Sequence, residues 1–340
     1  MLSEGARLHP ERPALVDGLT GEVTAYGALD ARAVVAAAEA DPDALTDALY
    51  AANGFLLLKG MHGITEEPAL LNRLSCLFGE EVENYRETGM RPTSVHTEVP
   101  EILIVSNMPP VDRPPPKRPE PPLTADGKLP VQFPHRRGWH TDQSYRRPPP
   151  DISLFYATIP SPKGQGQTLY ADCIAAYEAL PPALKTRVDD LVGIHVRPGS
   201  GRTEDAVRNG DTPDPLGPYE QPQHQPVVRT HPVSGKRSLY LCEAGQMDWT
   251  IGPFVGMEPG PDGEGARLLY EIMSHLTQPK FVYVHEWDKG DLVIYDNRTT
   301  LHAASWFDAE KHGRLMWRTT ISGNPGAEYE GERKSWLAGE

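Results

Sequence analysis

Apolar residues follow a helical spacing in the first part of this chain. Between residues 28 and 53, leucines, valines and alanines recur every three or four positions, interrupted at Asp41-Pro42-Asp43. This pattern predicts two helices. The apolar run 54–60, bounded by glycines, predicts a buried strand, and a further helix is expected over about residues 66–78. A second strand is expected at 101–107.

From residue 138 onward, short apolar runs alternate with turns rich in Gly, Pro and Asp. Helices near 173–180 and 264–276 interrupt them. Many short strands with turn punctuation favour a sandwich or barrel, so the expected fold class is mainly β with flanking helices. The predicted strands are 152–158, 167–171, 192–196, 226–231, 237–241, 281–285, 291–295 and 314–322.

Neither an internal repeat nor a convincing linker is visible, and we expect one domain over residues 1–340, with residues 1–26 as an N-terminal arm. The segment 108–131 begins with eight prolines between residues 108 and 122. Such a segment favours extended backbone without regular structure. It is interpreted either as a solvated surface loop or as a lid over a site on the segment that follows.

Composition narrows the class of protein. The formal net charge of −14 argues against nucleic acid as a partner, since phosphate binding depends on clustered Lys and Arg. Three widely spaced cysteines without a CxxC motif favour reduced, structural thiols. A cytoplasmic protein without a membrane partner is therefore expected, since no secretory signal or membrane-spanning run is recognised. Whether it forms a homo-oligomer is left open.

The stretch 138–143 carries the most informative chemistry. His140 and Asp142 are two positions apart, so on a β-strand both would project from one face. An imidazole beside a carboxylate suits a divalent metal, although such a pair also fits a solvated turn. The best candidate for a third ligand is His302. Two histidines and one carboxylate form the facial triad of non-haem Fe(II) oxygenases.

Four motifs occur in order over roughly residues 40–325 and carry a family resemblance. They are Trp139-His140-Thr141-Asp142, Gly166-Gln167-Thr168-Leu169-Tyr170, Asp296-Asn297-Arg298 with His302, and Arg314 with Arg318. Together they resemble the TauD/TfdA family of Fe(II)- and 2-oxoglutarate-dependent dioxygenases. The resemblance implies a double-stranded β-helix, the cupin-like jelly roll, with flanking helices.

The resemblance also implies the cofactors and their ligands. Fe(II) would be held by His140, Asp142 and His302, leaving positions for 2-oxoglutarate and O₂. Arg314 and Thr168 would bind the far carboxylate of 2-oxoglutarate, for which a guanidinium is a good match. The implied reaction is hydroxylation of an unactivated C–H bond of a small metabolite, with release of succinate and CO₂.

Arg318 lies four residues after Arg314 and therefore on the same strand face. The resemblance implies that it holds an anionic substrate, such as a carboxylate, sulfonate or phosphate. The alternative is a role in supporting 2-oxoglutarate or the barrel core. Further substrate-binding candidates are Asn107, His96 and Tyr145.

Asn297 is expected to fix the turn ahead of His302 and so to orient this ligand without binding the metal, a function that metal sites usually need. Two other functions stay open. The same cofactors would also support desaturation, cyclisation or other oxidative tailoring in natural-product biosynthesis. From a different class, the chain would be a non-catalytic jelly-roll binding protein.

Overall fold

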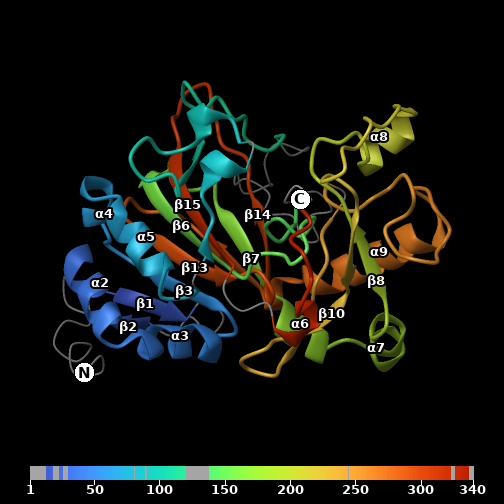
Figure 1. Cartoon of the computed structure of the whole chain (residues 1–340), viewed down its shortest axis with the longest axis horizontal. Coiled ribbons are helices and arrows are strands. Elements are labelled where there is room, and N and C mark those ends of the chain that lie inside the picture. Colours follow the sequence, from blue (N-terminus) through green and yellow to red (C-terminus); the bar gives the residue numbers. More distant parts are fainter. Residues whose placement is uncertain are drawn as a thin grey trace.

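The computed structural model describes residues 13–17, 23–25, 30–79, 81–88, 90–118, 138–243, 245–322 and 326–336 (Figure 1). Of the expected N-terminal arm, only the backbone of strands β1 (Pro13–Asp17) and β2 (Val23–Ala25) belongs to this set. The Pro-rich segment 108–131, expected to be a surface loop or a lid, is described only as far as residue 118, and its remainder lies outside the described residues.

The larger sheet is antiparallel, with the strand order β2-β1-β3-β13-β6-β15-β4. Strand β5 also pairs with β15, so β4 and β5 share its edge away from β6. The remaining bounds in this sheet are β3 (Phe55–Leu58), β4 (Glu81–Val82), β5 (Leu103–Ser106), β6 (Ile152–Ile159), β13 (Leu292–Asp296) and β15 (Leu315–Ser322).

A second antiparallel sheet has the order β12-β7-β14 and consists of Val282–His285, Thr168–Asp172 and Thr300–Ala304. Two antiparallel ribbons complete the described strands. They are β8 (Val192–His195) with β9 (Gln223–Pro226), and β10 (Val228–Thr230) with β11 (Arg237–Leu239).

Strand β3 shows how the sheets are held together. Its side chains alternate between two faces, and both faces are buried. Leu56 and Leu58 pack in a cluster with the N-terminal helices, whereas Phe55 and Leu57 pack with Tyr170 of β7. The larger sheet therefore has helices on one face and the smaller sheet on the other.

The helices are grouped on two sides of the molecule (Figure 1). The N-terminal group packs on the outer face of the larger sheet and consists of α2 (Ala31–Ala40), α3 (Pro42–Ala51), α4 (Gly63–Glu66) and α5 (Ala69–Ser75). The other described helices are α6 (Cys173–Glu178), α7 (Pro182–Val188), α8 (Glu204–Asn209) and α9 (Glu264–Leu276). None of the described helices is long and apolar enough to cross a bilayer.

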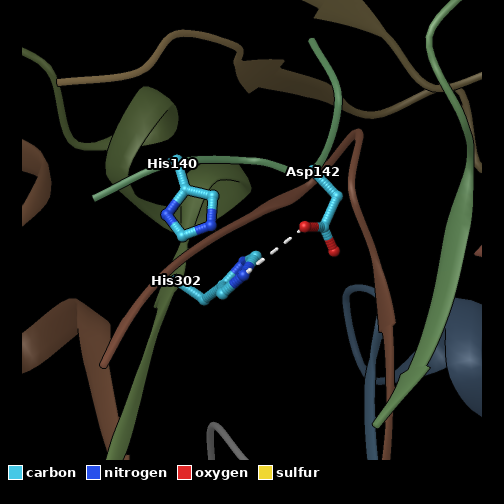
Figure 2. A group of neighbouring side chains, drawn as sticks. All are labelled: His140, Asp142 and His302. Atoms are coloured by element: carbon cyan, nitrogen blue, oxygen red, sulfur yellow. Dashed lines mark ion pairs between the residues drawn. The ribbon is translucent and has the colours of Figure 1, made fainter. Parts of the chain in front are cut away.

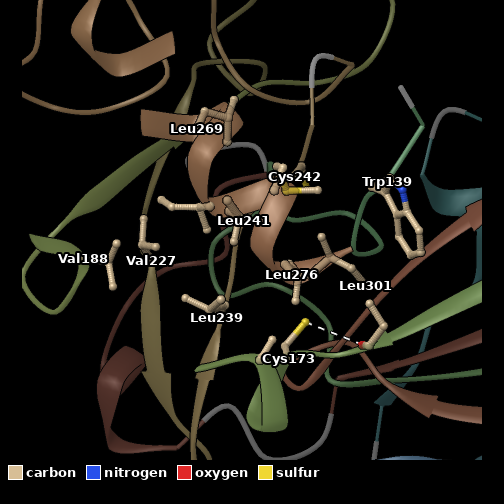
Figure 3. Close-up of a cluster of buried hydrophobic side chains, with 14 of the residues drawn as sticks. Trp139, Cys173, Val188, Val227, Leu239, Leu241, Cys242, Leu269, Leu276 and Leu301 are labelled. Carbon is tan, nitrogen blue, oxygen red and sulfur yellow. Dashed lines mark hydrogen bonds between the residues drawn. The ribbon is translucent and has the colours of Figure 1, made fainter. Parts of the chain in front are cut away.

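Helices α6, α7 and α9 pack with β10 and β11 around the largest buried cluster (Figure 3). Leu239, Leu269 and Leu276 lie within it, and Trp139 and Leu301 belong to the same cluster. Trp139 and Leu301 directly precede His140 and His302 in the sequence. The core therefore anchors the backbone at both histidines of the expected metal centre.

Sequence periodicity predicts most elements well. The two N-terminal helices, the buried strand after them and helix α9 are confirmed. Strand β14, which carries His302, and helices α7 and α8 were not predicted. The prediction that His140 and Asp142 share a regular strand is wrong, because residues 141–143 form no strand and the following residues turn.

Candidate metal centre

His140, Asp142 and His302 converge at one point between the sheets (Figure 2). One ligand atom from each lies within 4.8 Å of the others. His302 Nε2 is 3.9 Å from Asp142 Oδ1, and the two imidazole centroids are 4.2 Å apart. Three donors aimed at one position form an arrangement that can hold a single metal ion.

Backbone pairing brings the histidines together. The His140 N–H donates to the His302 carbonyl at 2.9 Å, and the His302 N–H donates back at 2.8 Å. His302 lies on β14, whereas His140 makes only this isolated bridge. Asp142 then turns toward the pair because the chain leaves extended geometry, with Gln143 at a φ of 52°. The convergence therefore comes from long-range pairing and a turn.

The tautomer of His140 is set by its own loop. Its Nδ1 lies 2.7 Å from the carbonyl oxygen of Gly138, which only a protonated nitrogen satisfies. Nε2 is then left as a lone-pair donor. Gly138 has a φ of +97°, a conformation that side chains with a Cβ rarely adopt. A glycine at this position lets the carbonyl reach the imidazole.

Asp142 is held by hydrogen bonds to its outer oxygen. Ser153 donates to Oδ2 at 3.0 Å and Tyr295 at 2.7 Å, while Arg318 pairs with Oδ1. Burial raises the pKa of this carboxyl, but the charge of Arg318, aided by His302 and His140, outweighs burial and brings the pKa well below its usual range. Asp142 is therefore an anion oriented toward the two histidines.

Asn297 connects the ligand segment to the sheet behind it. Its Oδ1 accepts from the backbone N–H of Asp142 at 3.1 Å, and its Nδ2 donates to Ser153 at 3.0 Å. The Thr141 hydroxyl donates to the Asn297 carbonyl at 2.7 Å. Asn297 thus fixes the backbone of one expected ligand and the serine that holds its carboxylate.

The donor set fits a divalent metal. Desolvation lowers the pKa of His302 to about 3 and also lowers the pKa of His140, so both rings are neutral near neutral pH. The contact between His302 and Asp142 is therefore not an ion pair. Neutral imidazole nitrogens with one carboxylate are the donors that non-haem iron and similar ions accept.

A cavity of about 320 Å³ opens beside the three residues. Arg314 and Arg318 both line it, because Arg314 precedes β15 and residues four apart share a strand face. Arg314 Nε and Nη2 and Arg318 Nε are buried with no hydrogen-bond partner among the described residues. Desolvation lowers the pKa of Arg314 to about 10, so it stays charged and requires an anion.

Thr168, at the start of β7, lines the same cavity. The indole N–H of Trp287 donates to its hydroxyl oxygen at 2.9 Å. One lone pair of the hydroxyl is thereby used, and its own hydrogen remains available to an acceptor in the cavity. Sequence reasoning did not identify Trp287, since nothing in the local pattern connects it with Thr168.

The three weaker substrate-binding candidates have different positions. Asn107 lines the cavity, but its amide donates to the His312 carbonyl at 2.9 Å and accepts from the Arg314 N–H at 2.7 Å. It therefore positions the segment that carries Arg314. His96 does not line the cavity and packs against Trp317, with ring centroids 5.1 Å apart.

Tyr145 is half-buried and does not line the cavity either. Desolvation raises the pKa of its phenol, with Arg318 and Asp142 among the charges that act on it. The roles expected for His96 and Tyr145 as direct substrate ligands are therefore not supported by their positions.

Three further residues at the centre were missed by sequence reasoning. Ser153 and Tyr295 hold Asp142, and Arg113 lines the cavity from the Pro-rich segment. Alternation along β13 places Tyr295 on the face toward the second sheet, which was a usable signal. Ser153 and Arg113 offered none, because their positions depend on how distant segments return to the site.

This chain is similar in sequence and in structure to several known proteins. An alpha-ketoglutarate-dependent 2,4-dichlorophenoxyacetate dioxygenase of Cupriavidus pinatubonensis is 35% identical over 190 residues, covering 54% of this chain and 59% of that protein. The chain thus spans less than two thirds of that relative. The pentalenolactone F synthase of Streptomyces arenae is 28% identical over 263 residues, covering 75% of this chain and 80% of that protein.

Among solved structures, AAD-2 in complex with Mn(II) and N-oxalylglycine is similar, with a TM-score of 0.59 and 27% identity. The match covers 84% of this chain and 88% of that one. Residues 8–320 match the family described as taurine catabolism dioxygenase TauD, TfdA family. With a match over nearly the whole chain, this protein belongs to the TauD/TfdA family.

Proposed function

We propose that this chain is an Fe(II)- and 2-oxoglutarate-dependent dioxygenase that hydroxylates an unactivated C–H bond of a small anionic metabolite. The observation that carries the proposal is that the His140–Asp142–His302 cluster adjoins one cavity, which is also lined by the two incompletely paired guanidiniums of Arg314 and Arg318. We also assign the two facing antiparallel sheets to a double-stranded β-helix. When bound together, Fe(II), 2-oxoglutarate and O₂ supply the oxidant for the hydroxylation and leave succinate and CO₂.

The metal ligands in this proposal are His140 Nε2, His302 Nε2 and the Asp142 carboxylate. The Gly138 carbonyl, Ser153 and Tyr295 hold the groups behind the ligand atoms. Such outer partners orient ligands and raise their basicity. The chain thus presents donors with fixed protonation, since both imidazoles are neutral and the carboxylate is ionised.

Arg314 and Thr168 bind the far carboxylate of 2-oxoglutarate in this proposal. A carboxylate would satisfy the free Arg314 Nε and Nη2 atoms together, in a bidentate arrangement. The Phe155 ring lies against the Arg314 guanidinium, with 5.7 Å between its centroid and Arg314 Cζ, and it helps to exclude water. The attraction between a buried guanidinium and a carboxylate is stronger than in water, because the effective dielectric constant of the site is lower.

The test is an anaerobic titration with Fe(II) and 2-oxoglutarate. A weak visible metal-to-ligand charge-transfer band is expected from the wild type, together with succinate release once O₂ is admitted. Arg314→Gln should need a 2-oxoglutarate concentration about tenfold higher or more for the same band, since bonds to charged groups contribute roughly 1.5–3 kcal/mol. A chain that binds metal but gives no band would support the non-catalytic binding protein instead.

The outcome of the oxidation has a second candidate. The pentalenolactone F synthase match covers 80% of that relative, more than the match to the phenoxyacetate dioxygenase covers. This broader match supports oxidative tailoring, including desaturation or cyclisation, as an alternative outcome to hydroxylation. Product analysis by mass spectrometry separates the two, because hydroxylation adds one oxygen atom whereas desaturation removes two hydrogens.

A further inference from the structure

We propose that Arg113 is a second anion-binding residue for the primary substrate, so that this site prefers a substrate with two negative charges. The inference rests on the proposed function, because it assigns the cavity beside the metal centre to that substrate. Arg113 and Arg318 both line the cavity. A substrate of this class carries either one phosphoryl-type group or two carboxylates.

The backbone brings Arg113 back to the site. Its N–H donates to the Ser106 carbonyl at 2.8 Å, which closes a compact turn after β5. Ser106 lies opposite Leu315 in the pairing of β5 with β15. Arg113 is therefore held next to the strand that carries Arg318, although the two residues are far apart in the sequence.

Arg113 lines the cavity from the Pro-rich segment. It is exposed to solvent, yet Pro114, Pro115 and Pro116 line the cavity beside it. The charge of Arg113 contributes to the lowered pKa of Arg314, which lines the same cavity. Its charge therefore acts on the interior of the site.

Counting charges among the described residues at the cavity gives the substrate class. Arg113, Arg314 and Arg318 line the cavity as cations. In the adjoining metal centre, a bound metal requires the Asp142 carboxylate as an anion and both imidazoles in their neutral form. The two charges of Fe(II) would balance the two of 2-oxoglutarate, and Asp142 balances one guanidinium. Two positive charges remain for the substrate, and cations left together without an anion are unfavourable.

Two pairs of probes of matched shape test this inference on the chain loaded anaerobically with Fe(II) and 2-oxoglutarate. Phenylphosphonate, a dianion at about pH 8, is compared with benzenesulfonate, a monoanion of the same shape. 2-Carboxyphenylacetate is compared with phenylacetate, so that two separated carboxylates are tested as well. Calorimetry measures the affinity of each probe. A change in the visible charge-transfer band shows whether the bound probe lies close to the metal.

In the wild type, at least one dianion should bind about tenfold more tightly than its monoanionic partner. Arg113→Gln should reduce this ratio to within about threefold of unity, and Arg113→Lys should restore part of it. Arg118→Gln is the matched control. It removes a charge from the same segment, but Arg118 stacks on Trp306 at 4.8 Å and does not line the cavity.

Equal affinities within both pairs would overturn the inference while leaving the proposed function intact, provided that the band forms. A preference for dianions that Arg113→Gln leaves unchanged would also overturn it, since the iron rather than Arg113 would then bind the second charge. If the band itself does not form, the proposed function fails and this inference fails with it.

Discussion

Two buried clusters in this protein use the same residue types for different ends. In the candidate metal centre, a histidine pair and Asp142 adjoin Arg318 and a cavity. In the second cluster, Asp296 accepts from His231 Nε2 at 2.9 Å and from the Arg298 guanidinium at distances down to 2.6 Å. Both clusters combine histidine, aspartate and arginine in a water-poor interior.

The difference lies in hydrogen bonds that are left unmade. Asp296 also accepts from the Arg298 N–H at 2.8 Å, and Arg298 lies 3.6 Å from Asp151. The metal centre instead leaves His302 Nδ1, two Arg314 nitrogens and Arg318 Nε without partners among the described residues. A satisfied network stabilises the fold, whereas open donors around a cavity retain capacity for a ligand.

The largest expected effect is on stability. Arg298→Met leaves Asp296 buried without its cation, and it should lower the free energy of unfolding by about 3–5 kcal/mol in urea titrations. Arg314 is similarly buried but incompletely paired. Arg314→Met should therefore change the unfolding free energy by less than about 1 kcal/mol, or increase it. Equal losses in the two variants would erase the distinction between the clusters.

Metal affinity should separate the histidines of the two clusters. His302→Gln should weaken Mn(II) binding, measured by electron paramagnetic resonance, by more than about 100-fold, the upper end of the effect of outer partners. His231→Gln should leave Mn(II) affinity within about threefold and cost roughly 1–3 kcal/mol of stability by leaving Asp296 short of a donor. Comparable loss of metal from both variants would contradict the assignment.

His195 is another buried histidine, and it belongs to neither of these two clusters. His195 Nδ1 forms a hydrogen bond of 2.8 Å with Ser144 Oγ, and its Nε2 is buried without a partner among the described residues. Desolvation lowers its pKa to about 3. In the unfolded chain the pKa of this histidine is about 6.5, so the unfolded state binds a proton at a higher pH than the folded state does. The contribution of His195 to stability is therefore fully present above about pH 6.5 and is lost as the pH falls below it.

Between about pH 6 and about pH 3.5, this one group should remove about 1.4 kcal/mol per pH unit from the unfolding free energy. His195→Gln should flatten the dependence by the same amount, as measured by urea unfolding at a series of pH values. An unchanged slope would show that His195 takes up its proton in the folded protein.

The smallest expected effect concerns Trp287. Trp287→Phe removes the hydrogen bond to Thr168 and should weaken 2-oxoglutarate binding about three- to tenfold, the range for one neutral hydrogen bond of roughly 0.5–1.5 kcal/mol. Adding this change to Thr168→Val should have little further effect, because both act through one hydroxyl. Mn(II) affinity is the control and should not change. Fully additive losses would mean that Trp287 acts independently of Thr168.

The sequence by itself determined the periodic elements and the types of donor. Helix α9 and strands β3 and β13 follow from residue spacing, because helical and extended backbones orient side chains by local geometry alone. Arg314 and Arg318 share a face for the same reason. The motifs around His140 and His302 supplied the candidate ligands, although they placed the first of these on a strand that does not exist.

Only the tertiary structure decided which donors remain open. His140 and His302 meet through a backbone bridge between distant segments, and Ser153, Tyr295 and Trp287 reach the site through contacts between strands. The same is true of Arg113, which returns to the cavity through a turn. Whether a buried polar atom has a partner depends on the whole surroundings of that atom. Local spacing therefore cannot distinguish the metal centre from the satisfied cluster around Asp296.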